Sequence, residues 1–253
     1  MKKLKYLFGS LVILLLTTVS CQETLDLAPV DYFGDGNYWR NEAQVSNFMV
    51  GLHKQLRDNQ FMFLRLGEMR SSNYSNIDRQ NTSLNELPII EQRIDENSPG
   101  VSNWAGFYGP ILQINLFIQK VEAITFMGET QKKYLLGQAY GLRAFYYFHL
   151  LRTYGGVPLW LEPEVLNGNT DPVKLRKARS TEAEVLTSIK NDLTQSVANF
   201  GNAASPAEKS QWSPRATLML KGEVYLWSAK VYGNTGDLAE AKNALNAVSG
   251  TSL

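Results

Sequence analysis

The chain has 253 residues, 44% of them hydrophobic and 19% charged, which predicts a folded globular protein and excludes wholesale disorder. Lys and Arg number 25 against 24 for Asp and Glu, so the sequence lacks the basic excess that binding to phosphate backbones requires. One cysteine and two histidines exclude an intramolecular disulfide and leave too little material for a zinc site or a histidine-dependent triad. We therefore expect no nucleic-acid partner, no metal and no cofactor.

The first twenty residues have the organisation of a bacterial export signal. Three lysines form a basic head, and residues 6–16 form an apolar run that is too short to span a membrane but has the length of a signal-peptide core. Cys21, the only cysteine, follows directly after a small polar stretch, as the acylated cysteine does in a bacterial lipoprotein. An ordinary secretory signal with a coincidental cysteine is the alternative. The leading prediction is removal of residues 1–20, lipidation of Cys21 and a polar tether over 21–40, which together anchor the protein without spanning the membrane.

After the tether, apolar residues recur at helical spacing, and no stretch shows several strands of period two. Asn41 is expected to cap a first helix that has one apolar face. A second helix is predicted over about residues 104–124, where Pro110 should kink the helix or begin its regular part.

The third helix, over about residues 130–153, is the most informative segment. Gly137, Gly141 and Ala144 form a stripe of small residues on it. Each glycine inside a helix costs roughly 1 kcal/mol relative to alanine, so the stripe predicts close approach of another helix. The aromatic residues behind the stripe predict a central, buried helix that ends at Gly155–Gly156.

Three more helices have clear start signals. Thr181 and Glu184 form a predicted capping box. Ser213–Pro214 places serine at a cap and proline at the first helical position, and Asp237 opens the last helix. The final pair forms a predicted hairpin over 214–249, close in length to the tetratricopeptide period of about 34 residues, although the repeat consensus is poorly matched.

A series of short motifs runs in order over almost the whole chain. They are Cys21, Leu25–Pro29, Tyr38–Trp39, Glu42–Ala43, Trp104–Tyr108, Asn115, Arg143–Tyr147, Tyr154–Leu159, Arg179–Thr181, Asp192–Leu193 and Pro214–Ala216. In this combination the chain resembles the SusD/RagB family of outer-membrane lipoproteins.

The resemblance implies an all-α, tetratricopeptide-like helical-repeat scaffold with long irregular loops. It also implies capture of nutrient, usually glycan, at the cell surface, and a partner, a TonB-dependent transporter of the SusC type, over which the lipoprotein sits as a lid. Residues 41–253 are then the N-terminal part of a SusD-like helical domain. Family members run considerably further than Leu253, so we expect a truncated chain with an incomplete binding site.

A long polar connection between Asp58 and Asn103 is the predicted ligand region, because loops of this length inside a domain are usually functional or disordered. Sugar recognition needs an aromatic face together with amide, guanidinium and carboxylate groups for the hydroxyls. The candidate ligand-binding residues that supply this set are Arg70, Asn73, Tyr74, Asn76 and Asp78. The alternative is a solvated loop whose polar groups bond to its own backbone.

Other candidate residues have structural interpretations. Trp104, Trp160 and Trp227 lie beside apolar helical patterns and are expected to pack in the core. His149, between apolar neighbours, is expected to be a core histidine and not a ligand, and His53 is expected at the surface.

The leading hypothesis is a non-catalytic, surface-exposed lipoprotein of the outer membrane that captures glycan and delivers it to a transporter. A helical-repeat protein that binds peptides is one alternative, and a lipid-anchored glycoside hydrolase is another. A hydrolase needs two carboxyl groups held across a cleft. No motif fixes such a pair here, and adjacent acids such as Asp95–Glu96 are expected to be solvated.

Overall fold

The computed structural model describes residues 38–71, 86–98, 100–101, 103–165, 168, 171–204 and 210–249. The chain divides into two compact units, 1–40 and 41–253. In the first unit the description covers only residues 38–40, where the rings of Tyr38 and Trp39 meet edge to face with centroids 5.1 Å apart. The predicted signal, Cys21 and most of the predicted tether lie outside the described residues.

The second unit is helical, and the part that the structure describes contains no strand, which confirms the all-α prediction. Its elements are α2 Glu42–Asp58, α3 Gln60–Leu66, η2 Glu68–Arg70, α4 Leu87–Ile90, α5 Ala105–Ala123, α6 Glu129–Tyr154, α7 Glu182–Phe200, α8 Pro214–Val231 and α9 Asp237–Ser249. No described helix is long and apolar enough to cross a membrane.

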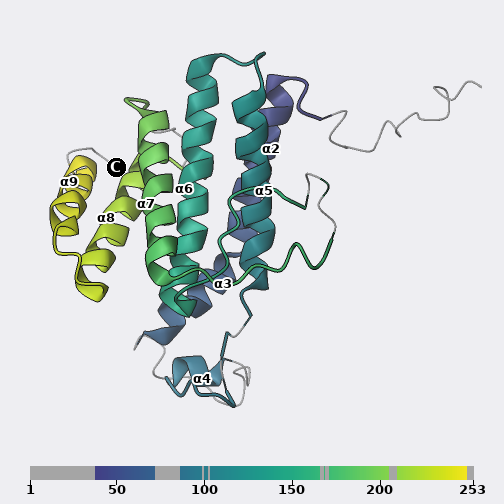
Figure 1. Cartoon of the computed structure of the whole chain (residues 1–253). Coiled ribbons are helices and arrows are strands. Elements are labelled where there is room, and N and C mark those ends of the chain that lie inside the picture. The colour runs from purple at the N-terminus through teal and green to yellow at the C-terminus, as the bar shows by residue number, and fades with distance from the viewer. Residues whose placement is uncertain are drawn as a thin grey trace, which may run out of the picture. The chain divides into compact units, whose positions relative to one another are not determined.

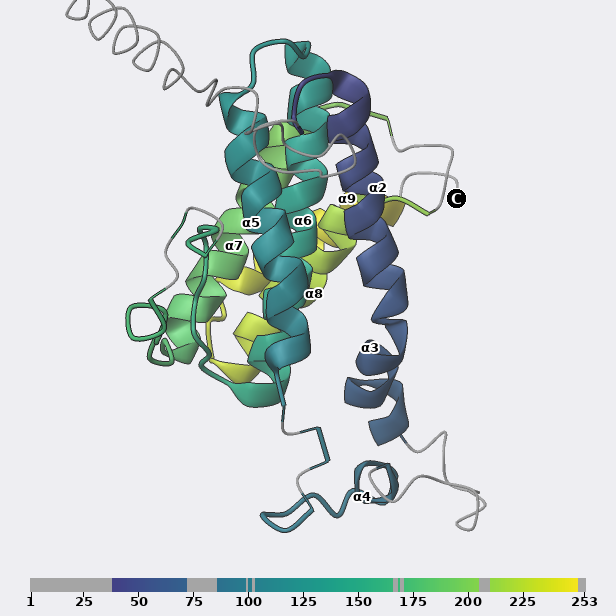
Figure 2. The same ribbon diagram turned by 90° about the vertical axis from the view of Figure 1, so that its right-hand side faces the viewer.

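The long helices pack in chain order. Figure 1 shows α5, α6, α7, α8 and α9 following one another across the unit, each against the next, with α2 against α5. The short helices α3 and α4 lie at one end of the long ones (Figure 2). This arrangement leaves one end of the bundle covered by short elements and loops.

The predicted start signals are confirmed by their hydrogen bonds. Asn41 Oδ1 accepts from the Gln44 amide at 3.0 Å. The capping box at Thr181 is formed in both directions with Glu184, and Ser213 Oγ accepts from the Ala216 amide at 3.1 Å. Each of these three helices, α2, α7 and α8, therefore begins where a side chain satisfies backbone donors that would otherwise lack partners.

Helix α6 is central and buried on nearly every side, as predicted. Its glycines accommodate aromatic rings. A Cβ at Gly137 would press against the Phe200 ring of α7, and a Cβ at Gly141 would overlap the indole of Trp212. The prediction of a closely approaching helix is therefore wrong for Gly141, where the neighbour is a tryptophan that precedes α8.

A buried polar network joins three helices to the segment that follows α6. The Arg143 guanidinium donates to both carboxylate oxygens of Asp192, at 2.8 and 2.7 Å. Its Nη1 also donates to Asn115 Oδ1 at 2.9 Å and to the Leu161 carbonyl at 3.1 Å. Asn115 Nδ2 donates in turn to the Trp160 carbonyl at 2.8 Å. Burial acts to lower the pKa of Arg143, but the hydrogen bonds and charge of Asp192 outweigh it and raise the pKa, so the guanidinium stays charged.

The expected surface position of His53 is wrong. Its side chain is 3% exposed, and Nδ1 lies 2.9 Å from the Met49 carbonyl. Nε2 accepts from the backbone amide of Trp212 at 2.8 Å, which links α2 to the start of α8. His149 is buried as predicted, with its ring 4.6 Å from the Phe63 ring and 4.5 Å from the Phe145 ring.

Both histidines make the stability depend on pH. Burial lowers the pKa of His53, and burial with the nearby charge of Arg152 lowers the pKa of His149 to about 3. The unfolded chain therefore binds protons below about pH 6.5 that the folded chain does not bind. Their stabilising contribution is complete above that pH and is lost as the pH falls. We expect the free energy of unfolding to drop by about 2 kcal/mol for His149 alone between about pH 7 and pH 5.

Urea unfolding at both pH values measures this drop in the wild-type chain and in His149→Gln. Glutamine does not titrate, so the variant should lose less stability on acidification than the wild type, by about 2 kcal/mol. An equal loss in the two proteins would show that His149 does not couple folding to protonation.

Candidate ligand pocket

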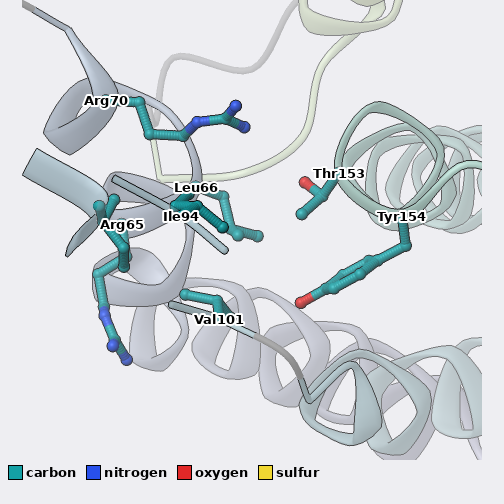
Figure 3. Close-up of a pocket in the computed structure, with 8 residues that line it drawn as sticks. Arg65, Leu66, Arg70, Ile94, Val101, Thr153 and Tyr154 are labelled. Atoms are coloured by element: carbon teal, nitrogen blue, oxygen red, sulfur yellow. The ribbon is translucent and has the colours of Figure 1, made fainter. Parts of the chain in front are cut away.

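A pocket of about 280 Å³ lies where the short helices meet the end of α6. Figure 3 shows Arg70 and Leu66 on one side and Thr153 and Tyr154 of α6 on the other. The residues that line it are Arg65, Leu66, Arg70, Ile89, Ile94, Val101, Thr153 and Tyr154. Two of these residues are arginines, two carry hydroxyl groups, and the other four are aliphatic.

Aromatic packing places α3 against the long helices. The Phe63 ring lies between rings of α5 and α6, 6.1 Å from Phe107 and 5.0 Å from Phe145. Asn59, at the turn between α2 and α3, approaches the Tyr146 hydroxyl at 3.5 Å. These contacts fix the direction of α3 and so the position of Arg65, the arginine that it carries.

The loop after α4 closes the outer side of the pocket. Gln92 Nε2 donates to the Arg70 carbonyl at 3.1 Å, which ties the loop to η2. Gly100 has φ +66°, a left-handed conformation, and a Cβ there would press against the buried side chain of Ile89. Glycine is needed at this position for both reasons.

The charge of the pocket is positive. Arg65 Nε lies 3.8 Å from a carboxylate oxygen of Glu86, whereas Arg70 is exposed. Figure 3 shows the Arg70 side chain extending toward Thr153 and the Arg65 guanidinium pointing away from it. Burial raises the pKa of Tyr154, against a smaller opposing effect of the Arg65 charge, so the phenol keeps its proton. Its hydroxyl donates to the Asn103 carbonyl over 3.5 Å, a long hydrogen bond that a ligand oxygen could replace. The pocket therefore offers donors to an oxygen-rich ligand.

None of the described residues that line this pocket is a carboxylate. Asp95, in the loop beside the pocket, accepts from the amides of Asn97 and Ser98 at 2.8 and 2.7 Å, and Glu96 is exposed. Both acids are exposed, which confirms the prediction that they are solvated, and Asp95 in addition stabilises a turn. No group of three potential metal ligands occurs among the residues that the structure describes.

The predicted ligand residues are only partly within the described chain. Arg70 lines the pocket, and Asn73, Tyr74, Asn76 and Asp78 lie outside the described residues. Sequence reasoning missed Arg65, Thr153 and Tyr154 as pocket residues. The last of these stands in a motif that carried the family resemblance, and no signal in the sequence pointed to its place beside Arg70.

The three tryptophans expected in the core are each half-buried. Trp227 meets the Phe148 ring edge to face at 6.1 Å, which fits that expectation. Trp104 and Trp160 each have a cation over the ring, Arg179 at 5.1 Å and Lys177 at 4.7 Å, and Trp104 also meets the Tyr154 ring edge to face at 5.5 Å. Two of the three therefore lie at the boundary between core and solvent.

Comparison with known proteins defines the class. Residues 31–229 match the family model of SusD-like proteins described as starch-binding and associating with the outer membrane, so the chain belongs to the SusD-like family. This confirms the resemblance drawn from the motifs.

Individual relatives give the same result. SusD-like protein P38 of Formosa agariphila is 30% identical over 90% of this chain and 43% of its own length. The solved structure of B. fragilis NanU is 41% identical, with a TM-score of 0.78, and covers 89% of this chain and 45% of its own. A SusD superfamily structure from Bacteroides fragilis is 39% identical, with a TM-score of 0.70. The match covers 83% of this chain and 43% of the chain in that structure. The chain thus spans less than half the length of these relatives.

Proposed function

We propose that this chain belongs to a cell-surface lipoprotein that binds glycan without catalysis and delivers it to a TonB-dependent transporter of the SusC type. The observation that carries the proposal is a pocket with two arginines, a phenol and aliphatic walls in a member of a family described as starch-binding. The family description also supports an outer-membrane location.

The pocket has the groups that a sugar needs. Arg70 and the hydroxyls of Thr153 and Tyr154 can donate to sugar oxygens, while the Tyr154 ring and the aliphatic walls can cover apolar faces of the ring. The segment with Asn73, Tyr74, Asn76 and Asp78 follows directly after η2, and we propose that it adds amide, aromatic and carboxylate contacts to the same ligand.

The same lining supports binding without hydrolysis. Glycoside hydrolysis requires two carboxyl groups on either side of the bond that is cut. The described lining supplies donors and apolar contacts, which suit capture and release. We therefore propose that the glycan leaves this site unchanged.

The anchor belongs to the proposal as well. Cys21, shortly after an apolar run, supports acylation of that thiol, and the polar residues after it support a tether that holds the helical unit at the membrane surface. Incorporation of labelled fatty acid into the cell-associated protein tests this part, and its absence would contradict it.

Replacing Arg70 by alanine should weaken glycan binding by about tenfold or more, because a hydrogen bond from a charged donor is lost. Arg93→Ala is the matched control, since Arg93 is exposed, pairs with Glu91 and does not line the pocket. A glycan array identifies a ligand of the wild-type chain, and calorimetry then compares the three proteins. Equal affinity of Arg70→Ala and Arg93→Ala would reject the pocket as the binding site.

A further inference from the structure

A second pocket, which shares no lining residue with the first, lies between α5 and the segment that follows α6. It has a volume of about 180 Å³. Tyr108 and Leu112 of α5 form one side, and Trp160, Glu162, Glu164 and Leu175 contribute the other. The volume lies below the range of about 300–1,000 Å³ that is usual for drug-sized ligands, so the pocket has room for a single ring and not for a chain.

The backbone at this pocket is held in place by side chains of the core. The Tyr108 hydroxyl donates to the Pro158 carbonyl at 2.8 Å. The Tyr147 hydroxyl accepts from the Trp160 amide at 2.7 Å and donates to the Trp160 carbonyl at 2.8 Å. Asn115 and Arg143 add the bonds to Trp160 and Leu161 described above. A segment without regular secondary structure is thereby fixed before any ligand arrives, which lowers the entropic cost of binding.

The charged residues of this pocket are acidic, whereas those of the first pocket are basic. Its charged residues are the carboxylates of Glu162 and Glu164, and no cation among the described residues pairs with either. The Trp160 indole already holds the Lys177 ammonium 4.7 Å from its ring centroid. An indole face and two carboxylates without a cation partner in the described part of the chain are the groups that bind an organic ammonium.

We propose that this second pocket binds one sugar ring that carries a protonated amine, a hexosamine. The apolar face of the ring stacks on Trp160, the ammonium and hydroxyls meet the carboxylates, and acidic sugars are repelled. This rests on the proposed glycan-binding role only for the choice of a sugar as the ligand.

Binding of three monosaccharides to the full chain at about pH 6.5 tests the charge preference, because an amine of this kind is protonated there. Glucosamine should bind about tenfold more tightly than glucose, the gain of one charge-assisted hydrogen bond, and glucuronate should bind more weakly than glucose. Calorimetry or saturation-transfer NMR measures all three. Absence of glucosamine binding, or glucuronate binding best, would overturn the proposal.

Substitutions that should weaken or tighten glucosamine binding test whether the amine sugar binds at this pocket. Glu162→Gln together with Glu164→Gln should abolish the difference between glucosamine and glucose, and Trp160→Leu should weaken both. Lys177→Met should tighten glucosamine binding, because a competing positive charge is removed, and leave glucose unchanged. Weaker glucosamine binding by Lys177→Met would contradict the proposed site.

Two further variants separate this proposal from the first. Glu96→Gln removes an exposed carboxylate elsewhere and should change nothing. Arg70→Ala should weaken the ligand of the first pocket and leave glucosamine unaffected. Loss of glucosamine binding in Arg70→Ala would assign the amine sugar to the first pocket. Melting temperatures close to the wild-type value show that each variant is folded. If Trp160→Leu does not fold, the double glutamine variant and Lys177→Met still test the proposed site.

Discussion

Replacing Asp192 by asparagine is expected to lower the free energy of unfolding by about 3–5 kcal/mol, which is a large part of the total for a typical domain. The side chains of Asp192 and Arg143 are 5% and 8% exposed, and the carboxylate accepts two hydrogen bonds from the guanidinium. Asparagine keeps the shape but removes the charge, so a buried guanidinium is left without compensation. Urea unfolding at neutral pH measures the loss.

The exposed pair between Lys221 and Glu240, at 2.9 Å, provides the control. Glu240→Gln should cost no more than about 1 kcal/mol, because solvent screens a surface ion pair. The double variant Asp192→Leu with Arg143→Met should recover much of the stability, since apolar residues of similar volume often replace a buried pair without loss. Equal costs for Asp192→Asn and Glu240→Gln would show that the buried pair is not a stabilising contact.

Gly141→Leu should destabilise the chain by about 3 kcal/mol, at the upper end of the cost of overpacking a core. The space beside Gly141 is filled by the Trp212 indole. That ring cannot move aside easily, because Nε1 donates to Thr217 Oγ1 at 2.8 Å and the backbone amide of Trp212 donates to His53. Thermal or urea unfolding measures the change.

Gly51→Leu is the matched control for this substitution. Gly51 lies inside α2, is exposed, and has no neighbour where a Cβ would stand. Here leucine should raise the free energy of unfolding by up to about 1 kcal/mol through its better helix propensity. If Gly141→Leu also stabilised the chain, the packing of Trp212 against α6 would be wrong.

The helices could be predicted from the sequence because their signals are local. Asn41, Thr181 and Ser213 cap helices within three residues of themselves, and apolar periodicity is visible within a few turns. Helix α5 also runs through Pro110, having begun five residues earlier at Ala105. Pro110 therefore does not begin the regular part of this helix, and a kink at this position stays a prediction.

Contacts between distant parts of the chain could not be predicted in the same way. The partner of His53 is 159 residues away, at Trp212. His53 lies four residues after the buried Met49, on the same face of α2, and this spacing indicates burial even for a polar side chain. The partner itself has no local signature.

The motif residues show the same limit. Asn115, Arg143 and Asp192 belong to separate motifs of the family resemblance, and the sequence does not show that they are in contact. The structure joins them in one buried hydrogen-bond network. Arg65 and Tyr154 meet at the first pocket from helices far apart in sequence. A single sequence identifies such residues by type, but only the packing of the helices tells which ones meet.

The two sides of the first pocket, α6 and the short helices α3 and η2, contribute differently to the stability of the fold. Thr153 and Tyr154 belong to α6, whose neighbours on nearly every side are core residues. Arg65 and Arg70 belong to short helices whose own side chains are mostly exposed or half-buried. Substitutions on the short helices can therefore alter what is recognised at little cost in stability, whereas α6 tolerates few. Divergence of ligand preference among related proteins is expected to concentrate on the short-helix side, against a constant opposite wall.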